Sequence, residues 1–163
     1  MLKIKNITVR NFMSVGNVTQ AVHFDNAGLT LVLGNNMDLG GDGSRNGTGK
    51  TTIINALSYA LYGAALYNIK KDNLVNKTNN KGMLVTVDFQ MDGIDYRIER
   101  GRKPNVFRFL VNNVDNNEGI TDEMQGEGRQ SQAVIERTIG MGHTMFKHIC
   151  ALNTYTEPFL SMR

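Results

Sequence analysis

The segment Gly47–Thr52, which reads Gly-Thr-Gly-Lys-Thr-Thr, constrains the fold more than any other feature. The apolar run Leu29–Gly34 precedes it across a glycine-dense loop, and apolar residues at helical spacing follow it as far as Tyr62. A buried strand, a glycine-rich loop, Lys-Thr and a helix together form a P-loop, which holds phosphate groups. A glycine-rich turn with a chance lysine would explain neither the strand nor the helix. The pattern therefore predicts a nucleoside triphosphate site.

Each part of this motif has a chemical role. Glycines allow successive backbone N–H groups to point at phosphate oxygens, and the N-terminus of the following helix adds partial positive charge. Lys50 is expected to reach the β- and γ-phosphates, and the Thr51 hydroxyl is expected to bind Mg²⁺. Lys50 and Thr51 are thus the predicted catalytic residues, and ATP with Mg²⁺ is the predicted cofactor set.

The composition fits one globular domain. The chain has 163 residues, of which 40% are hydrophobic and 20% charged, and the net charge of +3 permits an anionic partner without requiring one. Cys150 is the only cysteine, so no internal disulfide can form and a reducing, cytoplasmic compartment is expected. The thiol lies in an apolar run and is predicted to be buried. Neither a signal peptide nor an apolar run long enough to span a membrane is visible.

The order of elements favours one class of P-loop protein. A helix is predicted from about Gly49 to Tyr62, with Gly63 as its cap. Alternating residues then predict a hairpin around Asp92-Gly93 and a further strand at 107–111. Other predicted elements are strands at 2–9, 18–24 and 149–152 and helices at 131–139 and 143–148, with loops at 66–82 and 114–130. The predicted fold is an α/β P-loop NTPase, an ABC-type nucleotide-binding half-domain with an antiparallel β-meander, because a small kinase would alternate strands and helices instead.

A second acidic site, which a P-loop hydrolase needs for Mg²⁺ and water, is missing. The best candidate strand, Leu84–Asp88, places Asp88 on the polar face of an alternating strand, so we reject it as a metal site. No Leu-Ser-Gly-Gly segment is present either. The chain is therefore predicted to hold phosphates while the catalytic acid comes from elsewhere.

These features resemble the N-terminal lobe of the SMC-like DNA repair ATPases of the SbcC type, and most closely the phage members that serve recombination endonucleases. The resemblance spans nearly the whole chain and is carried by Arg10–Ser14, Leu29–Gly34, Asn46–Thr52 and Ala56–Gly63. It implies that residues 1–163 form a single N-terminal ATPase lobe that ends before a coiled coil. It also implies a complementary C-terminal ATPase lobe of the same protein, a homodimer of heads, an SbcD-type nuclease subunit, and DNA ends as substrate. An isolated lobe would then bind ATP with negligible turnover.

The resemblance also assigns residues. It places the phosphate cradle at Asn46, Gly47, Thr48 and Gly49, and the phosphate and magnesium positions at Lys50, Thr51 and Thr52. It places Arg10, Asn11 and Ser14 beside the nucleotide, although a plain strand end with a surface arginine is an alternative interpretation of these three. Asn153 stands near the family's Mg²⁺-sensing glutamine and keeps an amide on a shorter stem.

Three questions stay open at this point. Residues 35–45 form an expanded loop that either folds over the phosphates or bulges away, and its Asp38 and Asp42 are either metal neighbours or solvated turn residues. Five basic residues surround the predicted hairpin and either track DNA phosphates or form an ordinary solvated face: Arg97, Arg100, Arg102, Lys103 and Arg108. A stand-alone P-loop kinase or GTPase, or a non-catalytic nucleotide-sensing scaffold, remains an alternative function. The three histidines lack metal-site spacing and are predicted to be structural.

Overall fold

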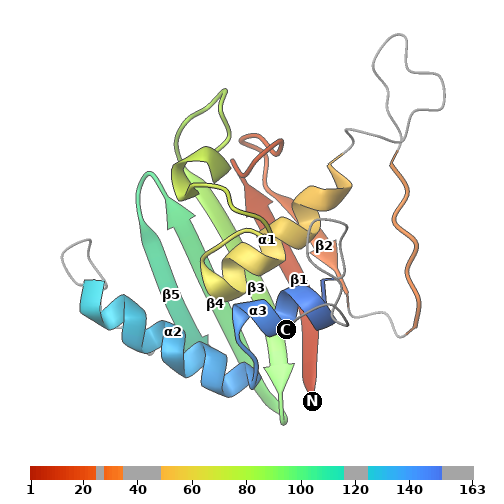
Figure 1. Ribbon diagram of the computed structural model, residues 1–163, viewed down its shortest axis with the longest axis vertical. Coiled ribbons are helices and arrows are strands. Elements are labelled where there is room, and N and C mark those ends of the chain that lie inside the picture. The colour runs from red at the N-terminus through yellow and green to blue at the C-terminus, as the bar shows by residue number, and fades with distance from the viewer. Residues whose placement is uncertain (25–27, 35–48, 116–124, 152–163) are drawn as a thin grey trace, which may run out of the picture.

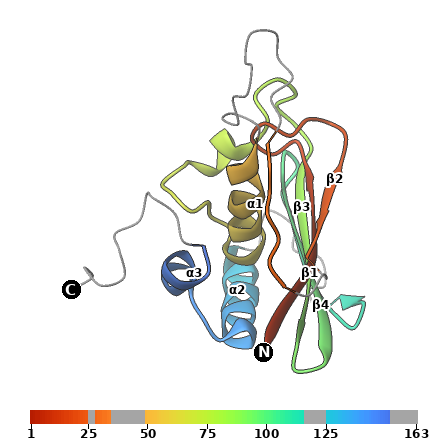
Figure 2. The same ribbon diagram turned by 90° about the vertical axis from the view of Figure 1, so that its right-hand side faces the viewer.

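The described residues form one antiparallel sheet with helices on one face. The computed structural model describes residues 1–24, 28–34, 49–115 and 125–151. The sheet has six strands in the order β2-β1-β3-β4-β5-β6, and every neighbouring pair is antiparallel. Figure 1 shows the helices crossing the sheet, and Figure 2 shows α1, α2 and α3 together on the same side. This architecture confirms the predicted α/β half-domain with an antiparallel β-meander.

The bounds of the elements follow the sequence pattern closely. The strands are β1 (Leu2–Arg10), β2 (Gln20–His23), β3 (Met83–Met91), β4 (Ile94–Arg102), β5 (Val106–Val111) and β6 (Val114–Asp115). The helices are α1 (Lys50–Tyr62), α2 (Gln125–Ile139) and α3 (His143–Ile149), with a 3₁₀ turn η1 (Lys71–Leu74). The predicted loop at 114–130 is partly wrong, because β6 occupies its start and α2 begins six residues earlier than the predicted 131.

Alternation along the strands separates a buried face from an open face. In β3, Val85, Val87 and Phe89 are fully buried against the helices. Their neighbours point the other way, where Asp88 accepts hydrogen bonds from Arg97 Nε at 2.6 Å and from Asn6 Nδ2 at 2.7 Å. Because successive side chains of a strand point to opposite faces, Asp88 lies away from α1, and its carboxylate is held by neighbouring strands.

The core lies between the sheet and α1. Ala56, Ala60 and Leu61 are fully buried, and Gly63 ends the helix in a left-handed conformation (φ 71°) with its N–H donating to Tyr59 O at 2.7 Å. Glycine adopts this conformation without the penalty of a Cβ atom. Helix α3 packs on the same helix through the Phe146 and Tyr62 rings, whose centroids are 5.3 Å apart. Helix α1 is thus enclosed over its C-terminal half, while its N-terminus is directed to the edge of the fold.

Two predicted strands are wrong for this chain. Residues 28–34 carry no secondary structure, and Leu29 is 102% and Leu31 79% exposed, although the apolar run predicts a buried strand. Figure 1 shows this segment running apart from the sheet. The described part of the run 149–152 is also not a strand: Ile149 ends α3, and Cys150 is exposed rather than buried. An apolar strand is buried only when a partner covers it, and no described strand pairs with residues 28–34.

Candidate nucleotide-binding site

The N-terminus of α1 forms the centre of the site. Its N-cap is Gly49 (φ 84°), which offers no side-chain acceptor to the first-turn N–H groups, and the first turn contains no acidic residue. Lys50 is half-buried and Thr51 is exposed, so the ammonium group and a hydroxyl stand at the positive end of the helix dipole. This arrangement suits an anion.

Ser14 is the described residue from outside the motif that reaches this helix end. Ser14 Oγ lies 3.3 Å from Thr52 Oγ1, and a Cβ atom added to Gly49 would lie 3.4 Å from Ser14 Oγ. Thr52 is 6% exposed, so its side chain packs inside the fold against Ser14, whereas the neighbouring Thr51 faces outward. The structure therefore brings Ser14, Gly49, Lys50 and Thr51 together at one place.

Arg10 and Asn11 take different positions from Ser14. Arg10 is the exposed last residue of β1, where it pairs with Leu84 of β3. Asn11 is fully buried, and its amide hydrogen-bonds Asn17 and Asn79 at 2.8 Å each. The three residues lie within five positions of the sequence, yet among the contacts that the structure describes only Ser14 contacts the N-terminal turn of α1.

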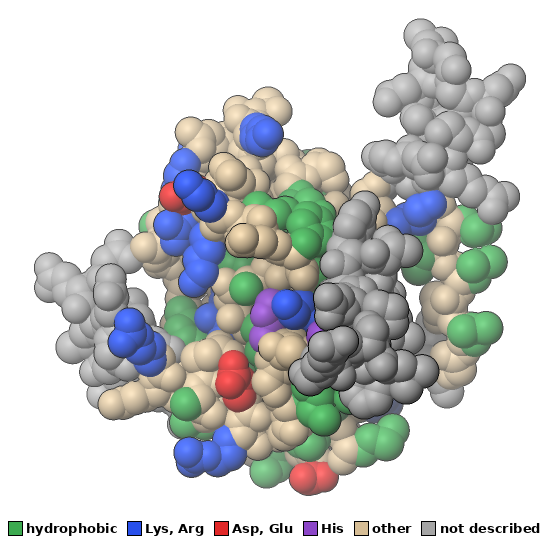
Figure 3. Space-filling view, in the orientation of Figure 1, with side chains coloured by type: hydrophobic (Ala, Val, Ile, Leu, Met, Phe, Trp, Pro, Cys, Tyr) green, Lys and Arg blue, Asp and Glu red, His purple; other side chains and the backbone are tan. Residues whose placement is uncertain are grey.

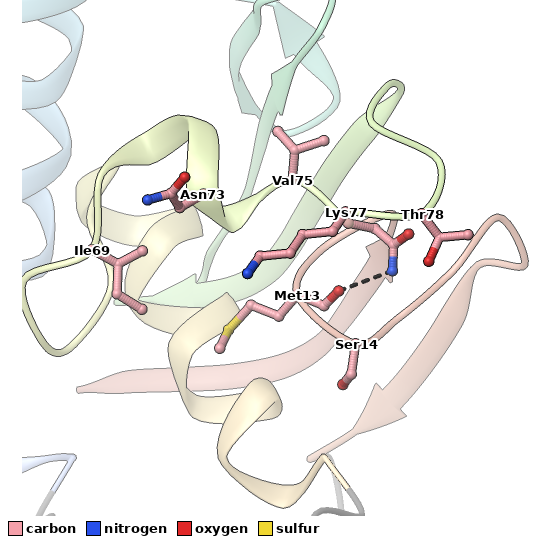
Figure 4. Close-up of a pocket in the computed structure, with 8 residues that line it drawn as sticks. Met13, Ser14, Ile69, Asn73, Val75, Lys77 and Thr78 are labelled. Atoms are coloured by element: carbon pink, nitrogen blue, oxygen red, sulfur yellow. Dashed lines mark hydrogen bonds between the residues drawn. The ribbon is translucent and has the colours of Figure 1, made fainter.

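Two pockets flank the turn that carries Ser14. One, of about 560 Å³, extends from Gly49 and Thr52 to Ala21 and Val22 of β2. The other, of about 630 Å³, lies between Met13, Ser14 and the segment 69–78 (Figure 4). Its walls combine apolar side chains of Met13, Ile69 and Val75 with polar side chains of Asn73, Asn76, Lys77 and Thr78. This mixed lining offers both apolar contacts and hydrogen-bonding groups to a small molecule.

The opposite end of α1 is held by a residue that sequence reasoning placed on a surface patch. Arg100 Nε donates to Ala60 O at 2.7 Å, its Nη2 donates to Leu61 O at 3.4 Å and also to Gln132 Oε1 of α2, and its guanidinium lies 4.0 Å from the Phe107 ring centroid. Burial lowers the pKa of Arg100 to about 10. The sequence indicates in part that Arg100 faces the helices, since it lies on the same strand face as the apolar Ile98. The partner Gln132 could not be predicted, because it is 32 residues away in sequence.

The five basic residues near the hairpin do not form one cluster. Arg97 and Arg108 lie on the open face and pair with Asp88 at 2.6 Å and Glu99 at 3.0 Å, while Arg100 faces the helices. Arg102 and Lys103 instead lie at the end of the sheet, where Arg102 pairs with Asp72 at 2.5 Å and Lys103 donates to Asn80 at 2.5 Å. The strand alternation divides the predicted patch among three surroundings.

Several predicted site residues lie outside the part of the chain that the structure describes. These are Asn46, Gly47, Thr48, Asn153 and the loop 35–45 with Asp38 and Asp42. Among the described residues, no group of three or more His, Cys, Asp or Glu side chains could hold a metal ion. His143 Nε2 lies 2.8 Å from Ser58 Oγ, and this contact joins α3 to α1. Within the described ranges, no helix is long and apolar enough to cross a membrane.

Comparison with known proteins gives a consistent result. A family profile described as "AAA domain" matches residues 6–149. Exonuclease subunit 2 of Enterobacteria phage T4 is 35% identical over 162 residues, which are 98% of this chain and 26% of that protein, and exonuclease subunit 2 of Escherichia phage RB69 is 33% identical with the same coverage. The DNA double-strand break repair Rad50 ATPase of Archaeoglobus fulgidus is 31% identical over 100 residues, which are 61% of this chain and 10% of that protein. The chain thus spans about a quarter of the length of the phage proteins.

Proposed function

The chain belongs to the AAA domain family, and on that premise we propose that it is the ATP-binding N-terminal lobe of a DNA repair and recombination ATPase that drives an associated nuclease at DNA ends. The observation that carries the proposal is the N-terminus of α1, where Gly49, Lys50 and Thr51 lie beside Ser14, which lines two pockets. The phage relatives bear the name of an exonuclease subunit, and the archaeal relative bears that of a DNA repair ATPase.

The residues present fit a magnesium nucleotide. Bound Mg²⁺ would neutralise phosphate charge, and the exposed hydroxyl of Thr51 is the described group placed to hold it. Lys50 would bind the phosphates beside the uncapped helix end, with Asn46, Gly47 and Thr48 completing the cradle. The pocket between Met13 and Thr78 would receive the nucleoside, because its apolar side chains suit a base and the exposed amide of Asn73 suits the polar edge of a base.

The exposed apolar segment 28–34 supports a complementary lobe. Leu29, Leu31 and Leu33 are each more than half exposed, which is costly for aliphatic side chains in water. Figure 3 shows hydrophobic side chains along this segment, beside the main body. A strand of a C-terminal ATPase lobe would cover these residues, and that lobe would supply the acidic residue that the described part of this site lacks. Asn153 would then serve as the amide near Mg²⁺, and two such heads would assemble around two ATP molecules.

Nucleotide binding is tested by calorimetric titration of ATP with Mg²⁺. Wild-type chain is expected to bind, and Lys50→Ala is expected to lose binding because the ammonium that contacts the phosphates is removed. Lys5→Ala is the matched control, since Lys5 pairs with Asp95 at 3.0 Å on the sheet. Unchanged affinity in Lys50→Ala would refute the phosphate site.

Hydrolysis separates the proposal from its alternatives. The proposed lobe binds ATP with negligible turnover until the complementary C-terminal lobe is added. Turnover by this chain alone would favour a stand-alone P-loop kinase or NTPase. Binding without turnover even after the complementary lobe is added would favour a nucleotide-sensing scaffold.

DNA and a nuclease subunit are the proposed macromolecular partners. Six basic residues gather around η1 and the β4–β5 turn: Lys70, Lys71, Lys77, Lys81, Arg102 and Lys103. Burial lowers the pKa of Lys71, and the nearby positive charges of Arg100 and Arg102 lower it further. Figure 3 shows Lys and Arg side chains gathered over the upper left of the molecule. Such a surface attracts the phosphate backbone of DNA.

The salt dependence of DNA binding tests this surface. Lys103→Gln is expected to weaken DNA binding and to reduce the slope of log affinity against log salt by about 1, because one phosphate contact is lost. Lys3→Gln is the control, because Lys3 lies at the start of β1, outside this group of basic residues. Equal slopes for both variants would remove this surface from the proposal, and co-purification with an SbcD-type nuclease subunit tests the protein partner.

A further inference from the structure

The turn at residues 11–17 is held in a conformation that its own sequence disfavours. Asn11 (φ 48°) and Met13 (φ 50°) both adopt the left-handed region, which L side chains avoid and which Met avoids more strongly than Asn. Such backbone strain persists only where surrounding contacts impose it, and it concentrates at functional sites. The segment 74–82 supplies these contacts, although it follows more than 50 residues later in the chain.

Backbone contacts join the two segments first. Met13 N donates to Leu74 O at 2.7 Å, and Asn76 N donates to Asn11 O at 2.8 Å. Phe12 and Val75 form an isolated antiparallel bridge between these bonds. The strained turn is therefore paired, residue by residue, with a short length of chain outside the main sheet.

Four asparagine side chains complete the contact. Asn76 Nδ2 donates to Met13 O at 2.9 Å, as the dashed line in Figure 4 shows, and its Oδ1 accepts from Asn79 N at 3.1 Å. Asn79 Nδ2 donates to Asn11 Oδ1 at 2.8 Å, and Asn11 Nδ2 donates to Asn17 Oδ1 at 2.8 Å. Asn11 is fully buried and Asn76 is 8% exposed, so these amides are used up within the protein and do not face a ligand.

The result of this network is the position of Ser14. Within the turn, Ser14 Oγ lies 3.3 Å from Thr52 Oγ1, and Ser14 lines both the pocket that reaches Gly49 and Thr52 and the pocket against residues 69–78. We propose that Asn11, Asn76 and Asn79 are positioning residues for the nucleotide: they hold the strained turn so that Ser14 and the pocket wall at Met13 stand in place against the P-loop helix. This inference rests on the proposed function, and it assigns Asn11 a role through Ser14 and not a contact with the nucleotide.

Asn79 is the most informative residue to replace. Asn11 is fully buried, so Asn11→Ala is expected to unfold the protein, whereas Asn79 is only half-buried and donates a single side-chain bond into the network. Asn79→Ala in the complete natural polypeptide is expected to raise the Kd for MgATP about five-fold, which is the effect of one ordinary hydrogen bond. Asn76→Asp, which keeps the acceptor but loses the donor to Met13 O, is expected to shift the Kd in the same direction.

The matched control is Asn6→Ala. Asn6 donates one part-buried bond to Asp88 at 2.7 Å on the open face of the sheet, away from α1. It is expected to lower the unfolding temperature about as much as Asn79→Ala while leaving the Kd for MgATP unchanged. If Asn79 has a positioning role, both variants lose a similar amount of stability, but only Asn79→Ala loses affinity for MgATP.

A double-mutant cycle tests whether Asn79 acts through Ser14. In a Ser14→Ala background, Asn79→Ala is expected to change the Kd by less than about two-fold, because residues that act through one another are not additive. The full loss in that background, or no loss in either background, would overturn the positioning role. Failure of the wild-type protein to bind ATP would instead overturn the proposed function and this inference together.

Discussion

Arg100 should stabilise the C-terminal end of the P-loop helix far more than a surface arginine could. The substitution Arg100→Met keeps an unbranched side chain over the Phe107 ring but removes the donors that serve Ala60 O, Leu61 O and Gln132 Oε1. The last carbonyls of a helix have no partner within the helix, so Ala60 O would lose its donor in a buried place, whereas Leu61 O would keep the hydrogen bond from Gln132 Nε2 at 3.2 Å.

The magnitude follows from the contacts. A buried acceptor left without a donor costs about 1–3 kcal/mol, and two of the three contacts, those to Ala60 O and Gln132 Oε1, are close. Removing the cation also relieves its desolvation, which is the reason that the pKa of Arg100 is lowered to about 10. The expected net loss is about 2–4 kcal/mol in the local stability of α1 and α2. A loss of 2 kcal/mol corresponds to a factor of about 30 in the opening equilibrium.

Hydrogen exchange followed by mass spectrometry measures this loss locally. Peptides covering 50–66 and 125–139 should exchange at least about 30-fold faster in Arg100→Met than in the wild type. Arg97→Met is the control: it lies on the same strand and pairs with Asp88, but its side chain is 45% exposed, so a loss of about 1 kcal/mol or less is expected. Equal protection of these peptides in the two variants would refute the reasoning.

Two further perturbations test the packing of the sheet and of α3. Gly101→Ala should destabilise the protein by about 1–3 kcal/mol in urea titrations, because a Cβ atom would lie 2.6 Å from Met83 O. At Gly16 the nearest atom would be 3.8 Å from the added Cβ, so Gly16→Ala should cost less stability. Equal losses of stability in the two variants would exclude the steric explanation. Burial, assisted by the charge of Lys147, lowers the pKa of His143, so the unfolded chain binds a proton first and stability should fall as the pH drops below about 6.5 towards the folded pKa. His143→Gln should flatten that dependence, and an unchanged pH profile would contradict it.

Local pattern was a reliable guide wherever an element is satisfied within its own neighbourhood. The helix from Lys50 to Tyr62 with its Gly63 cap, the hairpin at Asp92-Gly93 and the short helix from His143 all match the sequence prediction. The resemblance to the SMC-like repair ATPases is confirmed by the family profile and by the relatives. The two helices and the hairpin depend on residues within a few positions of one another, so periodicity and turn chemistry are sufficient to predict them.

Residues 28–34 and 149–151 show where such a pattern fails. Both runs are apolar enough to be strands, but Leu29 and Cys150 are exposed. Hydrophobic composition predicts burial without stating which part of the protein would cover the segment. The pattern predicts burial, and among the described residues no strand covers the segment 28–34.

By itself, the sequence determined the residues at the start of one helix, a glycine cap followed by a lysine and a threonine, and the P-loop pattern predicts that they hold phosphates. Only the tertiary structure decided which other residues serve that helix. It directed Ser14 towards the helix start, turned Asn11 inward to Asn79, and carried Arg100 from a basic hairpin to the helix end. The reason is physical, since these contacts join residues 38 to 68 positions apart, and their partners are set by strand register and a strained turn, which no local spacing encodes.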